Sequence, residues 1–382
     1  MSRPGLRPMR TLPLLEPRRA ELEKCVFCPK LCRSACPVSN AEPRETITPW
    51  GKMSLAWMTA HGDVPLDRPH ASPAWACTGC HACRGACDHR NPVADVLLDA
   101  RDALAREGVA PGGATRVLHG FAAHDGETRR AARDLASHPR VRADAKDALL
   151  VGCGYLRSAP REARDAVDAA AALVGGPVAL VEACCGLPLR LAGDAEGFAR
   201  HARSVARSLE GRARVLVVDA GCAMALRRRY PEAGVEVPGH VTVELLVERA
   251  ARSLGALSHV PHDAGATGKV RWHDPCQLGR GLGVYDAPRA VLTRALGRAP
   301  DEFDDAREYA ACSGAGGLLP STMPDVAGAI ADARLGAHAR AGGGRIVTAC
   351  ASSLLALRRR AASAGVAVDD IVTWIARAAR GM

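Results

Sequence analysis

Two tight runs of cysteine near the N-terminus constrain this chain more than any other feature. The first run is CVFCPKLCRSACP, which starts at Cys25, and the second is CTGCHACRGACD, which starts at Cys77. The first twenty residues are basic and Pro-rich without the continuous apolar stretch of a signal peptide, so we expect a cytoplasmic chain whose thiols are kept reduced. Fifteen reduced cysteines in such dense groups indicate metal binding rather than a disulfide scaffold.

The spacing within the two runs favours iron-sulfur clusters. Each 4Fe-4S cluster needs four soft ligands, and short spacings let one loop hold three of them. In two-cluster ferredoxins the fourth cysteine of each run crosses over to the other cluster. We therefore predict one cluster on Cys25, Cys28, Cys32 and Cys87, and a second cluster on Cys77, Cys80, Cys83 and Cys36.

Each run departs from the usual ferredoxin pattern at one point. The first has one extra residue between Cys28 and Cys32, which predicts a distorted or more labile cluster, and the second ends in Asp88 instead of Pro. The alternative hypothesis is zinc, which favours paired cysteines separated by a longer loop. We expect His81 and His89, beside the second run, to lie at the surface or in hydrogen bonds rather than to bind metal.

The pattern of apolar residues changes near residue 146. Residues 1–20 are expected to form a flexible tail, 21–110 a helical domain with a helix over Pro92–Glu107, and 111–145 a helical linker. From residue 146 short apolar runs alternate with Ala/Arg-rich helical stretches, which is typical of βα units with a parallel sheet. The expected strands are 148–152, 177–182, 214–218, 269–272, 308–311 and 345–348.

Each of these strands runs into a cysteine or a cysteine-bearing turn, and the turns form an internal repeat. Matching the Arg triplets 227–229 and 358–360 pairs Cys222 with Ser353 and Asp219 with Cys350. We therefore predict an α+β fold, with a helical two-cluster ferredoxin domain followed by two pseudo-repeated α/β domains at 146–255 and 268–378. The first copy holds Cys153, Cys184-Cys185-Gly186 and Cys222, and the second holds Cys276, Cys312-Ser313-Gly314 and Cys350.

The cysteines of the repeat are candidates for further metal binding. At the carboxyl ends of parallel strands they would gather along one sheet edge, where helix N-termini favour thiolates. The first copy offers enough thiols for an additional iron-sulfur cluster or a zinc ion, and the second offers a weaker set. The alternative is that they are small buried core residues. His273 and Asp274 are expected to orient a ligand or to cap the following helix.

The charge balance of the chain does not identify a partner, but together with the composition it argues against nucleic acid. The formal net charge is +10, yet only 3% of the residues are aromatic and the arginines are spread along the chain, so we expect no nucleic-acid partner. A weak contact with an anionic membrane surface or an acidic redox partner is a comparable alternative. No run approaches the roughly 20 apolar residues of a membrane span, so we expect a cytoplasmic location, alternatively peripheral on the inner face of the membrane.

Taken together, residues 21–378 resemble the iron-sulfur subunits that pair a two-cluster ferredoxin domain with two cysteine-rich CCG domains. Relatives of this kind include the iron-sulfur subunits of anaerobic glycerol-3-phosphate dehydrogenase and of glycolate oxidase, and heterodisulfide reductase subunits. The resemblance rests on the two tight runs and on Cys184-Cys185-Gly186, His273-Asp274-Pro275-Cys276 and Cys312-Ser313-Gly314-Ala315-Gly316-Gly317.

The resemblance implies an electron-transfer subunit that relays electrons from a partner dehydrogenase, expected to contain flavin, to a quinone or another acceptor. A complete CCG domain has a leading cysteine, a cysteine pair and a final CxxC. Here Asp219, Ser313 and Ser353 stand where cysteines are expected, which argues against the non-cubane cluster of heterodisulfide reductases. Two alternatives stay open: thiol or disulfide catalysis through Cys184, Cys185 or Cys222, and a zinc-stabilised interaction protein.

Overall fold

The computed structural model describes residues 9, 11–28, 32–261 and 268–379, which divide into two compact units. The first unit comprises the chain up to Gly120 together with two later segments, Pro188–Ala195 and Gly314–Ile330. The second comprises Phe121–Leu187, Glu196–Ser313 and the chain from Ala331 onward. Two short pieces of the C-terminal half therefore complete the N-terminal unit. None of the helices in the described ranges has the length and apolar character that a membrane span requires.

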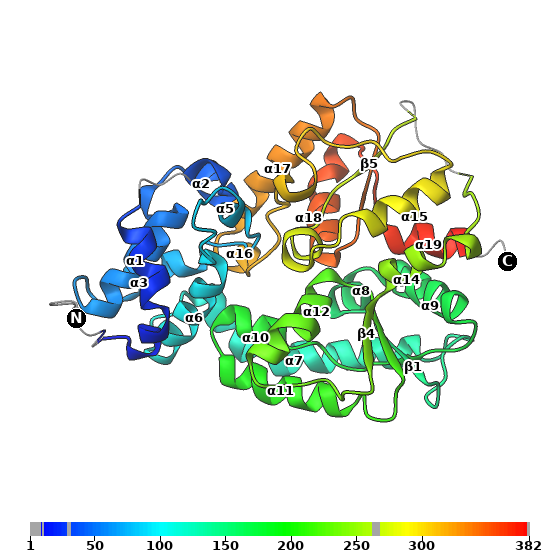
Figure 1. The fold of residues 1–382 in the computed structure, drawn as a ribbon, viewed down its shortest axis with the longest axis horizontal. Coiled ribbons are helices and arrows are strands. Elements are labelled where there is room, and N and C mark those ends of the chain that lie inside the picture. The colour runs from blue at the N-terminus through cyan, green and yellow to red at the C-terminus, as the bar shows by residue number, and fades with distance from the viewer. Residues whose placement is uncertain (1–8, 10, 29–31, 262–267, 380–382) are drawn as a thin grey trace. The chain divides into compact units, whose positions relative to one another are not determined.

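The first unit is helical (Figure 1). Its α3 helix begins after Thr48, whose hydroxyl accepts a hydrogen bond from the Gly51 N–H, and ends at Gly62, which has the left-handed φ of 78°. Its core includes the fully buried Trp75 and Leu97. The helices are α1 (Arg19–Val26), α2 (Pro37–Ala41), α3 (Pro49–His61), α4 (Arg68–Ala71), α5 (Ala82–Gly85), α6 (Val93–Arg106) and α16 (Leu319–Thr322).

Part of the N-terminal stretch differs from its expected flexible form. Pro13–Arg18 form the 3-10 helix η1, and the side chains of Met9, Leu12 and Leu15 are buried. These apolar side chains join the core of the first unit, so the segment is tied down where the structure describes it. Residues 1–8 and 10 lie outside the described residues.

Four helices of the described part of the chain contain residues of both units. The helix α7 (Gly112–Leu135) occupies most of the expected linker, and the others are α10 (Leu187–Ala192), α11 (Ala195–Arg207) and α17 (Pro324–Arg340).

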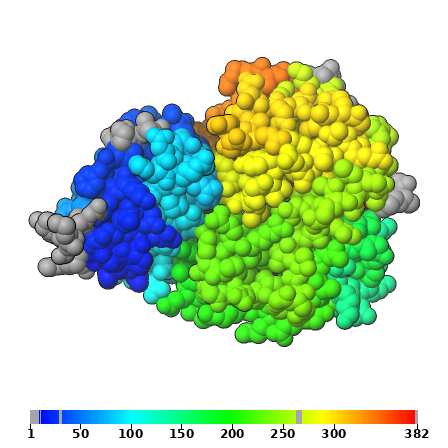
Figure 2. Space-filling view, viewed as in Figure 1, coloured from blue at the N-terminus to red at the C-terminus, as the bar shows by residue number. Residues whose placement is uncertain are grey.

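The second unit contains two parallel sheets. The strand order of the first sheet is β2-β1-β3-β4, with β1 (Asp147–Leu150), β2 (Ala179–Leu180), β3 (Arg214–Val217) and β4 (Thr242–Leu245). Figure 2 shows the outer face of this part of the chain in green, and three of the four residues in each of β1 and β3 are buried. Its helices are α8 (Cys153–Ser158), α9 (Pro160–Val174), α11 (Ala195–Arg207), α12 (Ala220–Met224), α13 (Tyr230–Glu232) and α14 (Leu246–Arg252), with a π-helix over Ala225–Arg229.

The second sheet repeats this order. It runs β5-β6-β7, with β5 (Val270–Trp272), β6 (Arg345–Thr348) and β7 (Val368–Asp370), and a parallel bridge joins Arg271 to Asp301 on the free side of β5. Asp301 thus stands where β2 stands in the first sheet. The helices are α15 (Asp286–Leu296), the later part of α17, α18 (Ala351–Ala361) and α19 (Ile371–Ala379), of which α19 packs against α9 and α15.

The predicted α+β class with repeated parallel-sheet domains is confirmed, but one expected strand is wrong. Residues 308–311 are not a strand, since Arg307–Tyr309 form a 3-10 helix and the Tyr309 side chain is 78% exposed. The Arg280 guanidinium binds the carbonyls of Glu308 and Ala310, which occupies two groups that a sheet would use. The strands β4 and β7 were not expected from the sequence.

Candidate metal centres

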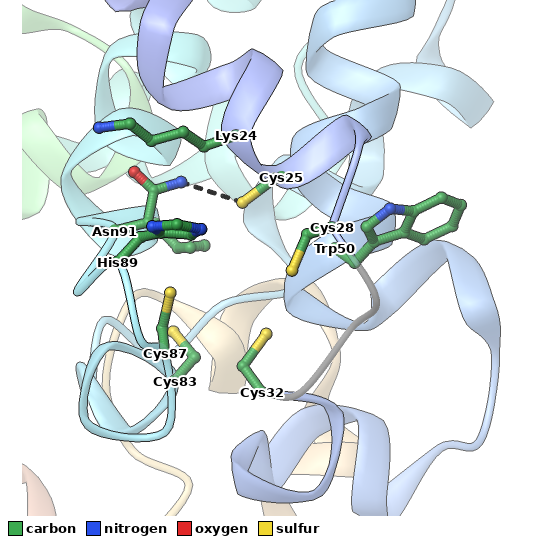
Figure 3. Close-up of a pocket in the computed structure, with 10 residues that line it drawn as sticks. Lys24, Cys25, Cys28, Cys32, Trp50, Cys83, Cys87, His89 and Asn91 are labelled. Carbon is green, nitrogen blue, oxygen red and sulfur yellow. Dashed lines mark hydrogen bonds between the residues drawn. The ribbon is translucent and has the colours of Figure 1, made fainter.

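The first candidate centre is a cavity of about 360 Å³ in the N-terminal unit, open to solvent on one side. Figure 3 shows the sulfur atoms of five cysteines pointing into one gap. One comes from the end of α1, two from the loop that follows, and two from α5 and the turn after it. The five are Cys25, Cys28, Cys32, Cys83 and Cys87.

A buried polar side chain binds one sulfur atom of this cavity. Asn91, which is 2% exposed, donates from Nδ2 to the Cys25 Sγ at 3.0 Å and to the Glu21 carbonyl at 2.7 Å. Burial raises the pKa of the Cys25 thiol to about 12 and that of Cys32 to about 11. These two thiols hold their protons at neutral pH when no metal is bound, so the soft iron of a cluster would displace those protons as it binds.

A second cavity of about 320 Å³ holds the other thiols of the two runs. Cys36, which precedes α2, lines this cavity together with cysteines of the second run. The Gly79 N–H donates to the Cys77 Sγ at 3.4 Å. His81 is 3% exposed and also lines it, so this histidine is not at the surface. The cysteines of this cavity are Cys36, Cys77, Cys80 and Cys83.

The two cavities bring the cysteines together in the crossed arrangement that the spacing predicts. Cys36 leaves its own run and lies with the second run, whereas Cys87 leaves the second run and lies with the first. Cys83 lines both cavities. Each cavity therefore has the four soft donors that a 4Fe-4S cluster needs, while the pairing of each sulfur with a particular iron stays a prediction.

Three further residues at these cavities were missed in the sequence. They are Asn91, Lys52 on α3 and Arg101 on α6. The guanidinium of Arg101 is 2% exposed and donates to the carbonyls of Ala74, Cys77, Leu191 and Gly317 at 2.9–3.0 Å. A charged residue on the apolar face of a helix is the signal that would have pointed to Arg101, because such residues are buried only with partners.

The second unit holds a continuous row of thiols. Cys153 begins α8, Cys184 and Cys185 follow β2, and Cys222 lies in α12. Cys153 contacts Cys184, Cys184 contacts Cys185, and Cys185 contacts Cys222. A nitrogen of His124, from α7, joins the sulfurs of Cys153 and Cys184 in a group whose ligand atoms all lie within 4.8 Å of one another. These residues fit a metal centre with several thiolate donors and one imidazole at its edge.

Hydrogen bonding divides these thiols into two kinds. Contact with the Cys184 thiol, aided by His124, lowers the pKa of Cys153 to about 6. Contact with Cys184 and Cys222 also lowers the pKa of Cys185, while the pKa of its two thiol neighbours is raised. Asp125 accepts the Cys184 N–H at 2.9 Å, and the Tyr230 hydroxyl donates to the Cys185 carbonyl at 2.9 Å, so the backbone of the pair is fixed.

The three positions that lack the expected cysteine have other structural roles. Asp219 caps α12 by accepting the N–H groups of Gly221 and Cys222, and its second oxygen accepts the Ala351 N–H at 2.9 Å. Ser313 and Ser353 share a buried hydrogen bond of 2.9 Å between their hydroxyl oxygens. The second copy thus places an oxygen pair where the first copy places Cys185 and Cys222.

The three cysteines of the second copy are placed on separate elements. Cys350 is buried at the N-cap of α18, where burial raises its pKa to about 12. Cys312 is 5% exposed, and Cys276 is half-buried before the π-helix Gln277–Gly281.

His273 and Asp274 belong to a network of buried charges. Arg334 donates to the His273 Nδ1 at 3.1 Å, and burial lowers the pKa of this histidine to about 3. Asp274 accepts two hydrogen bonds from Arg289, at 2.9 and 2.7 Å, and one from the Trp272 ring.

Comparison with known proteins finds two families along the chain. Residues 21–91 match the family of 4Fe-4S dicluster domains, and residues 148–227 and 270–358 match the family described as cysteine-rich domain. The chain is similar to one of the subunits of the dihydromethanophenazine:CoB-CoM heterodisulfide reductase of Methanosarcina barkeri, with 26% identity over 94% of each chain.

Two other relatives match over shorter lengths. One of the subunits of the CoM/CoB fumarate reductase of Methanothermobacter marburgensis is 26% identical over 80% of this chain and 61% of its own. The EtfAB:quinone oxidoreductase of Syntrophomonas wolfei is 34% identical over 36% of this chain and 18% of its own.

Proposed function

We propose, since this chain belongs to the iron-sulfur proteins that join a 4Fe-4S dicluster domain to two cysteine-rich domains, that it is the electron-transfer subunit of an oxidoreductase complex. The observation that carries this proposal is the pair of neighbouring cavities, each lined by four or more cysteine thiols drawn from both runs. Sites of this kind carry single electrons and do not need a substrate pocket of their own.

The residues of the chain have defined roles in this function. The cysteines hold the clusters, which supply one-electron chemistry when bound. Burial of Cys25, Cys32, Cys36 and Cys80 keeps bulk water from that side of the sulfur atoms. Hydrogen bonds to the sulfurs, such as those from Asn91 and the Gly79 N–H, tune the potential.

We further propose a flavin-containing dehydrogenase as donor and a quinone or comparable carrier as acceptor. The names of the relatives support a partner protein in a complex, since two are subunits of reductases and a third is a quinone oxidoreductase. The net charge of +10 favours a place at an anionic surface, so we propose a cytoplasmic protein peripheral on the inner face of the membrane.

The ligand assignment is tested by matched cysteine variants of the full chain, purified without oxygen. Iron, sulfide and zinc are measured first, and EPR spectra of reduced protein are then compared. We expect C36A to lose the same signal as C77A, and C87A to lose the same signal as C25A. The opposite pairing would contradict the crossed assignment. Protein without iron and sulfide would contradict electron transfer altogether, and zinc in their place would favour an interaction protein.

A further centre in the first cysteine-rich domain is the second part of the proposal. The row Cys153, Cys184, Cys185 and Cys222 offers four adjacent sulfurs, which suits an additional iron-sulfur cluster or a zinc ion. The same row would also serve thiol or disulfide catalysis. C185S distinguishes these roles: with the N-terminal clusters intact, loss of metal alone indicates a relay centre, whereas loss of turnover on a disulfide substrate with the metal retained indicates catalysis.

A further inference from the structure

Lys52 is a buried cation next to the second cavity. Its side chain lies on α3, is 2% exposed and places Nζ 3.5 Å from the Cys36 Sγ. Within the described ranges no carboxylate pairs with it, and the sulfur is its hydrogen-bond acceptor. Lysine is rarely buried without an anionic partner, because removing its charge from water is costly. The negative charge that balances the Lys52 ammonium therefore has to come from the cysteine sulfurs.

A second buried cation acts on the same cavity. Arg101 donates to the Cys77 carbonyl at 2.9 Å and is 2% exposed. Burial raises the pKa of the Cys77 thiol, and the positive charges of Lys52 and Arg101 oppose this rise. The electrostatic fields of both cations therefore reach this sulfur. Two fixed positive charges therefore lie within the interior around the second cavity.

The first cavity has a different electrostatic setting. The hydrogen bond to its Cys25 sulfur comes from the neutral amide of Asn91. Lys24 and His89 line this cavity but are exposed to solvent, which screens their charge.

We propose that Lys52, supported by Arg101, gives the cluster at Cys36, Cys77, Cys80 and Cys83 a higher reduction potential than the cluster at Cys25. Reduction adds one negative charge, and buried cations stabilise the reduced form more than screened or neutral groups do. With both clusters bound, one electron would pass from the reduced cluster at Cys25, which is thereby oxidised, to the cluster at Cys77, which is thereby reduced, and no proton is required. Electrons would then arrive at the cluster at Cys25 and leave from the cluster at Cys77. This inference rests on the proposed electron-transfer function.

The test is an anaerobic redox titration of the full chain followed by EPR. C25A and C77A assign the two signals. We expect the cluster at Cys77 to be reduced first, at the higher potential. K52M should lower the midpoint potential of this cluster and leave the other within error, whereas K52R, which keeps the charge, should stay close to the wild type. R106M, at an exposed arginine on α6 that lines neither cavity, is the control for the loss of a positive charge and should shift neither potential.

Two results would overturn the inference: a cluster at Cys25 that is reduced first, or equal potentials in K52M and wild type. If K52M does not assemble the second cluster, K52Q replaces it in the comparison and should lower the same midpoint potential. The order in which the two wild-type clusters are reduced tests the inference independently. Both of these failures leave iron and sulfide in place, so they are distinguishable from failure of the proposed function, in which no cluster signal is seen.

Discussion

Replacement of Arg101 should destabilise the first unit and release one cluster before the other. Its guanidinium donates to four backbone carbonyls, and four bonds from a charged donor contribute about 6 kcal/mol at about 1.5 kcal/mol each. Burial lowers the pKa of Arg101 to about 10, a cost of roughly 3 kcal/mol. The net contribution is about 3 kcal/mol, and the carbonyls left unpaired in R101M raise the loss to about 5 kcal/mol.

The assay follows denaturant unfolding under anaerobic conditions together with iron release to a chelator. We expect R101M to lose about 3–5 kcal/mol and to release the iron at Cys77 first, because the Cys77 carbonyl is one of the four acceptors. R106M on the same helix is the control: Arg106 is exposed and pairs with Asp102, so its loss should stay within about 0.5 kcal/mol. A loss below about 1 kcal/mol in R101M, or equal release of both clusters, would refute this reasoning.

Three further outcomes are expected. Gly317 has a φ of 63°, and a Cβ added to it would lie 2.0 Å from the Cys77 carbonyl oxygen. G317A should therefore lower the melting temperature and speed the release of iron, which a chelator assay measures. Unchanged iron release would show that the loop can shift to make room. Burial raises the pKa of Asp370 to about 7, so the folded state holds a proton that the unfolded chain releases, and stability should fall by about 2 kcal/mol between about pH 5.5 and pH 8. D370N should lack this fall in paired melting curves, and parallel curves for the two proteins would argue against it. The double variant S313C/S353C restores a sulfur pair where two hydroxyls lie 2.9 Å apart, and it should bind more iron than wild type on reconstitution; equal iron contents would count against a metal-ready second copy.

The grouping of the N-terminal cysteines was predictable because it depends on local spacing. Each run is short enough that its loop gathers its own thiols, and the exchange of Cys36 and Cys87 follows the crossed pattern of two-cluster ferredoxins. The side chains that form hydrogen bonds to the cysteine sulfurs were not predictable from the sequence. Lys52 reaches Cys36 from sixteen residues away and Asn91 reaches Cys25 from sixty-six, so tertiary packing alone brings them together.

The missed strands have a common physical cause. Edge strand β4 carries Glu244 and β7 carries Asp370, and both side chains are buried, which disrupts the apolar pattern that identifies strands. Glu244 pairs with Arg214 and Arg252, and Asp370 accepts the Tyr155 hydroxyl, so each of these buried carboxyl groups has partners from other parts of the sequence. A single sequence does not show such partners. The same reasoning explains how Asp219 could replace a cysteine and serve as a helix cap instead.

The dicluster domain does not form a compact unit from its own residues alone. Its compact unit includes Pro188–Ala195 from the first cysteine-rich domain and Gly314–Ile330 from the second, and Arg101 binds a carbonyl in each segment. Gly316 and Gly317 pass so close to the Thr78 and Cys77 carbonyls that no side chain fits there. Recombination that moved residues 21–91 alone into another redox protein would leave this surface uncovered. A functional transfer of this domain between proteins therefore has to include the two loops of the cysteine-rich domains as well as the cysteine runs. Substitutions in the dicluster domain and in these loops should depend on one another.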